Sequence, residues 1–160
     1  MRKNLWLFLL KLLVFSLALG YLWFTRYQRL YPYWIDGVAD PFFEFVGVRK
    51  WWLGLVVEHF TNLVPYLALV LASPGFFRHW RRTLAALVGG VAILVLGHLL
   101  LSWAVYHFNE LYSLSRSFYR IVIPMYIIND ALPLLLWLSF FPSLLTELFG
   151  FKWLGKTTEK

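Results

Sequence analysis

Apolar residues occur in four long runs, and the segments between these runs hold nearly all of the charged residues. The hydrocarbon core of a bilayer is about 30 Å thick and is crossed by roughly 20 helical residues. Because lipid offers no hydrogen bonds to the backbone, a crossing segment must be a helix that satisfies its own N–H and C=O groups. The pattern therefore predicts an all-α, polytopic membrane protein with four transmembrane helices, at about residues 5–24, 52–72, 84–108 and 131–149.

The composition agrees with this class. Hydrophobic residues make up 61% of the chain and charged residues 14%, against about 25% charged in ordinary soluble domains. One small helical bundle uses the whole length, so we expect a single transmembrane domain over residues 1–160. The chain has no cysteine, which excludes disulfides, thiolate metal sites and a cysteine nucleophile.

The basic residues indicate the orientation of the chain. With the N-terminus inside, nine of the 15 Lys and Arg residues fall on the cytoplasmic side and six on the outer side. Basic residues favour the cytoplasmic side, so we expect a protein of the cell inner membrane with both termini in the cytoplasm. The net charge of +7 suits a membrane surface with anionic lipids, and we expect no nucleic-acid partner.

Residues 26–50, between the first two runs, are unusually rich in aromatic side chains. Aromatic rings concentrate at the headgroup level, which predicts an interfacial helix in this outer loop. Asp40 followed by Pro41 is a typical helix start. Asp36, Asp40 and Glu44 would form an acidic stripe if one helix ran through them, but Pro41 argues against an unbroken helix. We interpret these acids as a solvated face and not as a cation site.

The outer loop at residues 109–129 is predicted to hold a second interfacial helix. Asp130 precedes Ala-Leu-Pro, which favours a helix cap at Asp130 and a fourth span that begins at Ala131. If the fourth span instead begins near Ile121, Asp130 lies inside the bilayer, where an ionisable residue suggests a functional role.

The third run carries small residues at spacings of four and seven, namely Ala86, Gly90 and Gly97. These spacings place the three residues on one helix face. Small residues let helix backbones approach closely in lipid. We therefore expect this face to pack against the second run or against another chain.

Polar side chains within the apolar runs are the candidates for chemistry. They are Glu58, His59, Asn62, His98 and Ser102. We interpret them as a polar cluster that hydrogen-bonds neighbouring helices. The alternative is a redox subunit in which His59 and His98, at similar depths on adjacent helices, bind a haem or a pigment. Leucine and valine crowd the turns beside both histidines, so we expect no cofactor.

Motifs of membrane hydrolases are absent. The chain contains no Gly-x-Ser-x-Gly, no His-Glu-x-x-His and no glycine-rich phosphate loop, which argues against an enzyme. A small channel or transporter would need several copies of the chain, and no repeated half with broken helices supports one. The aromatic surface exceeds what four helices can bury, which favours an accessory or structural subunit that binds lipids and other integral membrane proteins, in a homo- or hetero-oligomer.

Three segments of the sequence are similar to those of one protein family. They are NLVPYLALVLAS at residues 62–73, the basic RHWRR at 78–82 before a glycine-rich apolar helix, and ALPLLLW at 131–137. They resemble the small exosortase-associated inner-membrane proteins of Gram-negative bacteria and cover about a third of the chain. The resemblance implies an accessory factor of a protein-sorting system. It implies no catalytic residues, since the Cys, Arg and His of exosortases have no matching set here.

Overall fold

The computed structural model describes residues 2–48, 57–76, 79–112 and 116–144 of the chain. Within these ranges the side chains of several residues, among them Asp36, Glu58 and His59, lie outside the description. The described residues are helical apart from short turns and contain no strand, which confirms the predicted all-α class.

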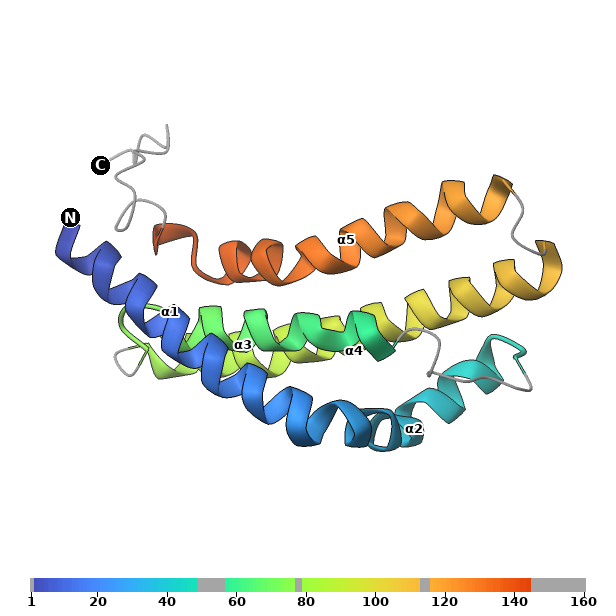
Figure 1. The fold of residues 1–160 in the computed structure, drawn as a ribbon, viewed down its shortest axis with the longest axis horizontal. Helices are drawn as coiled ribbons and strands as arrows, with labels where there is room; N and C mark the ends of the chain where they lie inside the picture. Colours follow the sequence, from blue (N-terminus) through green and yellow to red (C-terminus); the bar gives the residue numbers. More distant parts are fainter. Residues whose placement is uncertain (1, 49–56, 77–78, 113–115, 145–160) are drawn as a thin grey trace, which may run out of the picture.

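The described chain forms five α-helices, a π-helix and a 3₁₀-helix, arranged as an elongated bundle (Figure 1). In chain order they are α1 (Arg2–Leu22), the π-helix η1 (Trp23–Tyr27), α2 (Gln28–Phe45), the 3₁₀-helix η3 (Val57–Asn62), α3 (Leu63–Ala72), α4 (Trp80–Tyr112) and α5 (Arg116–Phe140). The beginning of α1 and the end of α5 lie at the same end of the bundle (Figure 1).

Three stretches of described helix are long and apolar enough to cross a membrane. They are Asn4–Ile35, Trp80–His107 and Arg120–Phe140, which agrees with a multi-pass membrane protein. The predicted second span is represented by the shorter apolar helix Phe60–Ala72. Six 3₁₀ residues and ten α-helical residues in η3 and α3 together extend about 27 Å. The fourth crossing therefore stays a prediction. The described part of that segment, η3 and α3, is nearly long enough to cross the hydrocarbon core.

The predicted helix start at Asp40 is wrong, because the helix runs through it. The chain continues from α1 through η1 into α2, and α2 contains Pro32 and Pro41. A proline inside a helix removes one backbone hydrogen bond. Here α2 gains the burial of Ala39 and Phe43, which are 0% and 1% exposed, and this packing outweighs the loss. Asp40 and Glu44 are exposed on α2, as expected of a solvated face.

The predicted helix cap at Asp130 is also wrong. Helix α5 continues through Pro124 and Pro133 and places Asp130 in its middle. The alternative start near Ile121 agrees with the span Arg120–Phe140. Of the predicted fourth run, residues 131–140 belong to α5, and residues 145–149 lie outside the described residues.

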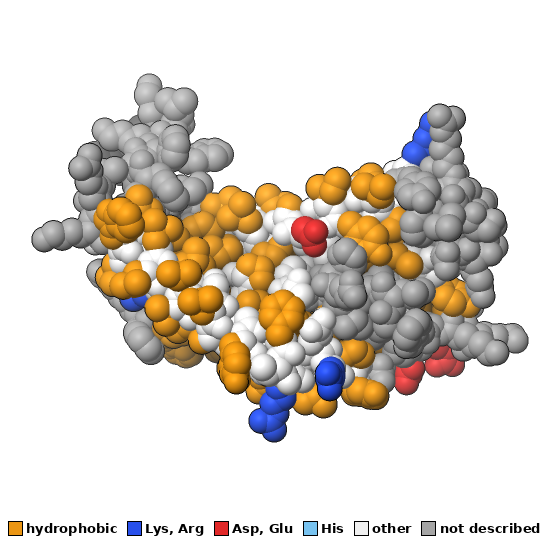
Figure 2. Space-filling model, viewed as in Figure 1, with side chains coloured by type: hydrophobic (Ala, Val, Ile, Leu, Met, Phe, Trp, Pro, Cys, Tyr) orange, Lys and Arg blue, Asp and Glu red, His pale blue; other side chains and the backbone are white. Residues whose placement is uncertain are grey.

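The core lies where α3 meets its neighbours. Helix α4 packs along α5, while α3 contacts α1, α4 and α5, as Figure 1 shows. The largest fully buried side chains include Phe43, Phe60, Tyr66, Leu94 and Leu101. Large apolar side chains also cover much of the outside, and charged side chains on the face in Figure 2 are sparse. Such a surface suits contact with lipid or with other membrane helices.

Candidate functional site

A chain of buried hydrogen bonds centred on His98 joins four elements of the bundle. The His98 side chain, on α4, is 0% exposed. Its Nδ1 lies 2.8 Å from the Tyr31 hydroxyl on α2, and its Nε2 lies 2.7 Å from Asn62 Oδ1 at the end of η3. Asn62 Nδ2 in turn donates to the backbone carbonyl of Asn129 on α5, at 3.0 Å. This His98 network connects segments 67 residues apart in the sequence.

The chemistry of the partners sets the direction of every bond in the network. A backbone carbonyl can only accept, so Asn62 must turn its NH₂ group toward Asn129 and its oxygen toward His98. The neutral imidazole therefore carries its proton on Nε2, which donates to Asn62 Oδ1. Its Nδ1 then accepts from the Tyr31 hydroxyl. Both nitrogens of His98 are occupied within the chain.

The imidazole ring is also held by aromatic contacts. Phe60 stacks on it, with ring centroids 4.2 Å apart and an angle of 22° between the planes. Tyr31 meets the ring edge-on at 5.7 Å and 85°. One turn farther along α4, the Ser102 hydroxyl donates to the His98 backbone carbonyl at 2.7 Å. These contacts leave the ring little freedom to rotate.

The network has a local cause in α5. A helical carbonyl normally accepts the N–H four residues later, and for Asn129 that residue is Pro133, which has no N–H. A freed carbonyl inside a membrane helix needs another donor. Asn62 supplies it. This bond explains why α5 continues through Pro133, and it gives Asn62 a structural role.

A second polar contact joins three helices near the other end of α3. The indole N–H of Trp137 on α5 donates to Ser73 Oγ at 2.8 Å, and Ser73 Oγ donates to the Leu69 carbonyl at 2.8 Å. Phe8 of α1 stacks on Trp137, with centroids 5.7 Å apart. Neither Ser73 nor Trp137 was predicted as a site residue from the sequence. A hydroxyl at a helix end and an indole N–H in an apolar run were the available signals.

The structure brings together some of the predicted polar residues. Asn62, His98 and Ser102 lie within the His98 network, whereas the side chains of Glu58 and His59 lie outside the described residues. The predicted pairing of His59 with His98 is therefore still a prediction. Tyr31 was missed, because its aromatic-rich segment was interpreted as a headgroup-level element. In the described part of the chain, no three His, Asp or Glu side chains gather as metal ligands would.

The small residues of α4 pack against two different helices. Ala86 and Gly90 meet Tyr66 of α3, whose hydroxyl donates to the Ala86 carbonyl at 2.5 Å. A Cβ at Gly90 would lie only 1.7 Å from the Tyr66 hydroxyl oxygen. Gly97 faces α5, where a Cβ would lie 3.4 Å from a Leu132 methyl group.

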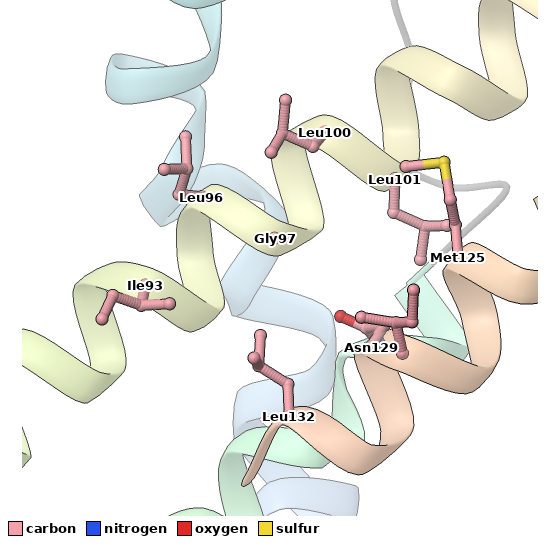
Figure 3. A pocket seen from close by; sticks show the side chains of 9 residues that line it. Ile93, Leu96, Gly97, Leu100, Leu101, Met125, Asn129 and Leu132 are labelled. Atoms are coloured by element: carbon pink, nitrogen blue, oxygen red, sulfur yellow. The ribbon is translucent and has the colours of Figure 1, made fainter. Parts of the chain in front are cut away.

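Gly97 also lines an apolar pocket of about 290 Å³ between α4 and α5 (Figure 3). The side chains of Leu96 and Leu100 on α4 and of Met125 on α5 line it. Leu96 and Leu100 are 48% and 42% exposed, so the pocket opens to the outside of the bundle. We call this feature the α4–α5 groove.

A smaller, more polar pocket of about 180 Å³ lies where α4 begins and α5 ends. His79, Arg82 and Ser143 contribute its polar groups. The Arg82 Nε–H donates to the Phe140 carbonyl, and its guanidinium lies 5.5 Å from the Phe141 ring centroid. Arg82 thus joins the beginning of α4 to the end of α5.

Comparison with protein-family models, with curated proteins and with solved structures finds no match for this chain.

Proposed function

We propose that this chain is a non-catalytic accessory or structural subunit of a larger inner-membrane complex. One observation carries the proposal: three buried polar side chains, those of Asn62, Ser73 and His98, hold different elements of the bundle together. Asn62 and His98 join α2, η3, α4 and α5, and Ser73 joins α3 to α5. Thr83 and Ser102 donate to backbone carbonyls. Reactive sites need polar groups directed at a substrate, whereas these groups bond to other groups of the same chain.

The haem alternative receives no support from this geometry. A histidine that ligates haem iron needs one ring nitrogen directed at the metal. In His98 one nitrogen faces Tyr31 and the other faces Asn62, while Phe60 covers a face of the ring. Binding iron would require the network to open and would leave buried polar groups to find new partners.

The outer surface supports the class of partner that we propose. The α4–α5 groove is apolar and lies within the candidate spans Trp80–His107 and Arg120–Phe140. Apolar side chains and a glycine at its base suit a membrane helix, which packs in lipid through close backbone approach. The resemblance to exosortase-associated proteins makes a protein-sorting system the candidate complex.

A site-specific test uses a photo-crosslinking amino acid at Leu96, which lines the groove. We expect this variant, in native membranes, to crosslink to one particular integral membrane protein, whose level falls when the chain is deleted. The matched control is Leu10, which is exposed on α1 and is expected to give no such product. If the Leu96 variant captured only lipid, and deletion left every other membrane protein unchanged, the accessory role would be overturned.

We also propose that the common end of α1 and α5 faces the cytoplasm. Arg81 and Arg82 are exposed at this end, at the beginning of α4, and basic residues favour the cytoplasmic side. A reporter enzyme that is active only outside the cytoplasm should then be inactive when fused after Lys160 and active when inserted after Gly47, in the turn that follows α2. The reverse activities would invert the orientation.

A further inference from the structure

Asp130 is an exposed carboxylate in the middle of a helix that is otherwise suited to cross a membrane. It is ten residues from each end of the span Arg120–Phe140, which places it about 15 Å from both ends. Its side chain is too short to reach a headgroup layer at that distance. A charge at this depth is costly unless a partner compensates it.

The described part of the chain does not supply that partner. The Asp130 side chain forms no ion pair or hydrogen bond with any described residue. Ile127 and Leu134, which lie one turn to either side of it on α5, are apolar and 64% and 51% exposed. The acid therefore lies on an apolar helix face that is open to a partner from outside the described residues.

The His98 network shows which basic residue of the same chain lies at this level. The network runs across the bundle from Tyr31 on α2 to the backbone of Asn129 on α5. Arg29 is two residues from Tyr31, and Asp130 follows Asn129 directly. Arg29 and Asp130 therefore lie at similar levels along the bundle, on different elements.

Arg29 is also open to a partner. Its side chain is exposed, and it forms no ion pair with a described residue. Helix α5 runs along one edge of the bundle, and α1 meets α2 at the opposite edge (Figure 1). Lys and Arg side chains project from that opposite edge in Figure 2. Asp130 on α5 and Arg29 on α2 thus belong to elements at opposite edges.

We propose that Asp130 of one copy forms an ion pair with Arg29 of a second copy inserted in the same orientation. Two copies with one orientation hold these residues at matching depths, and the charges are complementary. An Arg guanidinium can bind a carboxylate with two parallel hydrogen bonds. Because the elements that carry the acid and the base lie at opposite edges, the contact is head-to-tail, and its repetition gives a ring of copies where the rotation closes. This self-association is separate from the proposed accessory role.

Crosslinking between copies tests the contact while both charges remain in place. The natural chain has no cysteine, so introduced thiols are the only reactive ones. One tagged copy carries Leu134→Cys, beside Asp130, and a differently tagged copy carries Leu30→Cys, beside Arg29. Both leucines are exposed. We expect a short bis-maleimide to join the two tags in native membranes. A pair of copies that both carry Leu134→Cys is the control and should give little product.

Variants of the two charged residues then distinguish an ion pair from a contact between apolar side chains. Asp130→Asn and Arg29→Gln should each lower the crosslinked fraction at least fivefold, whereas Asp130→Glu should preserve it. Glu44→Gln and Arg120→Gln change exposed charges elsewhere and should leave the fraction unchanged. The exchange of both charges, Asp130→Arg with Arg29→Asp, should restore the product.

Three results would overturn the proposal: monomers only, a product that Asp130→Asn leaves unchanged, or a Leu134→Cys product with a different protein. Melting of each variant in detergent shows that it is folded. If the exchanged pair fails to fold, the contrast between Asp130→Glu and Asp130→Asn decides. The accessory role is tested separately, by the crosslink from Leu96. Failure of the ion-pair proposal therefore does not imply failure of the accessory role, or the reverse.

Discussion

Replacement of His98 by alanine is expected to lower the free energy of unfolding by about 3 kcal/mol. The side chain is fully buried and bonded at both ring nitrogens. Its loss leaves the Tyr31 hydroxyl and Asn62 Oδ1 facing a cavity, and each unsatisfied buried group costs about 1–3 kcal/mol. The stacked Phe60 ring loses its neighbour as well. Reversible unfolding in mixed micelles, with increasing SDS, measures the difference.

His107→Ala is the matched control, because His107 lies on the same helix and its ring stacks on the Trp103 ring. It is partly exposed, and we expect its loss to cost less than about 1 kcal/mol. Equal costs for the two variants would show that the His98 network adds no stability. An absorption spectrum of the purified parent checks the redox alternative. A Soret band that disappears in His98→Ala would show that His98 binds haem.

Replacement of Gly90 by leucine is expected to prevent α3 from packing against α4. Even a Cβ would lie 1.7, 2.2 and 2.6 Å from three atoms of the Tyr66 ring and hydroxyl, distances that no real contact shows. Tyr66 is itself fully buried and bonded to the Ala86 carbonyl, so it cannot swing away cheaply. We expect Gly90→Ala to cost about 2–3 kcal/mol and Gly90→Leu more, enough to lower the folded yield. The same SDS unfolding assay measures both variants.

The neighbouring glycine provides a sharp comparison. A Cβ at Gly89 would meet only a Phe140 ring carbon at 3.5 Å, which is ordinary contact. Gly89→Ala should therefore be neutral or slightly stabilising, since alanine favours a helix more than glycine does. Gly90→Ala should also cost much less in a Tyr66→Leu background, which removes the ring. Equal effects at Gly89 and Gly90, or no coupling with Tyr66, would contradict the packing described here.

The His98 network and the Gly90 contact illustrate two ways to hold helices together in lipid. Apolar burial contributes little there, because lipid tails are as apolar as the side chains. Close backbone approach and internal hydrogen bonds therefore carry the association. In this chain the α3–α4 contact uses the first through Gly90, and the contacts of α5 with η3 and α3 use the second through Asn62 and Trp137.

The sequence by itself determined the class of the protein. Long apolar runs leave the backbone no alternative to helices, so the all-α fold and a multi-pass membrane protein followed from composition and length. Asn62, His98 and Ser102 could also be chosen from the sequence, since polar groups in apolar runs need partners. Two helix starts were predicted wrongly, because Pro41 and Pro133 were expected in the first turns of helices that in fact begin earlier and continue through them.

Only the tertiary structure decided which groups meet. The pairing of Tyr31 with His98 depends on the contact of α2 with α4, and nothing in the aromatic-rich segment of Tyr31 distinguishes a buried tyrosine from one at a membrane surface. The continuity of α5 depends on an amide 67 residues away that replaces the hydrogen bond lost at Pro133. That same continuity places Asp130 at the middle of a span and not at its end. Local sequence fixes which backbone bonds are missing, but the donors that replace them come from distant segments.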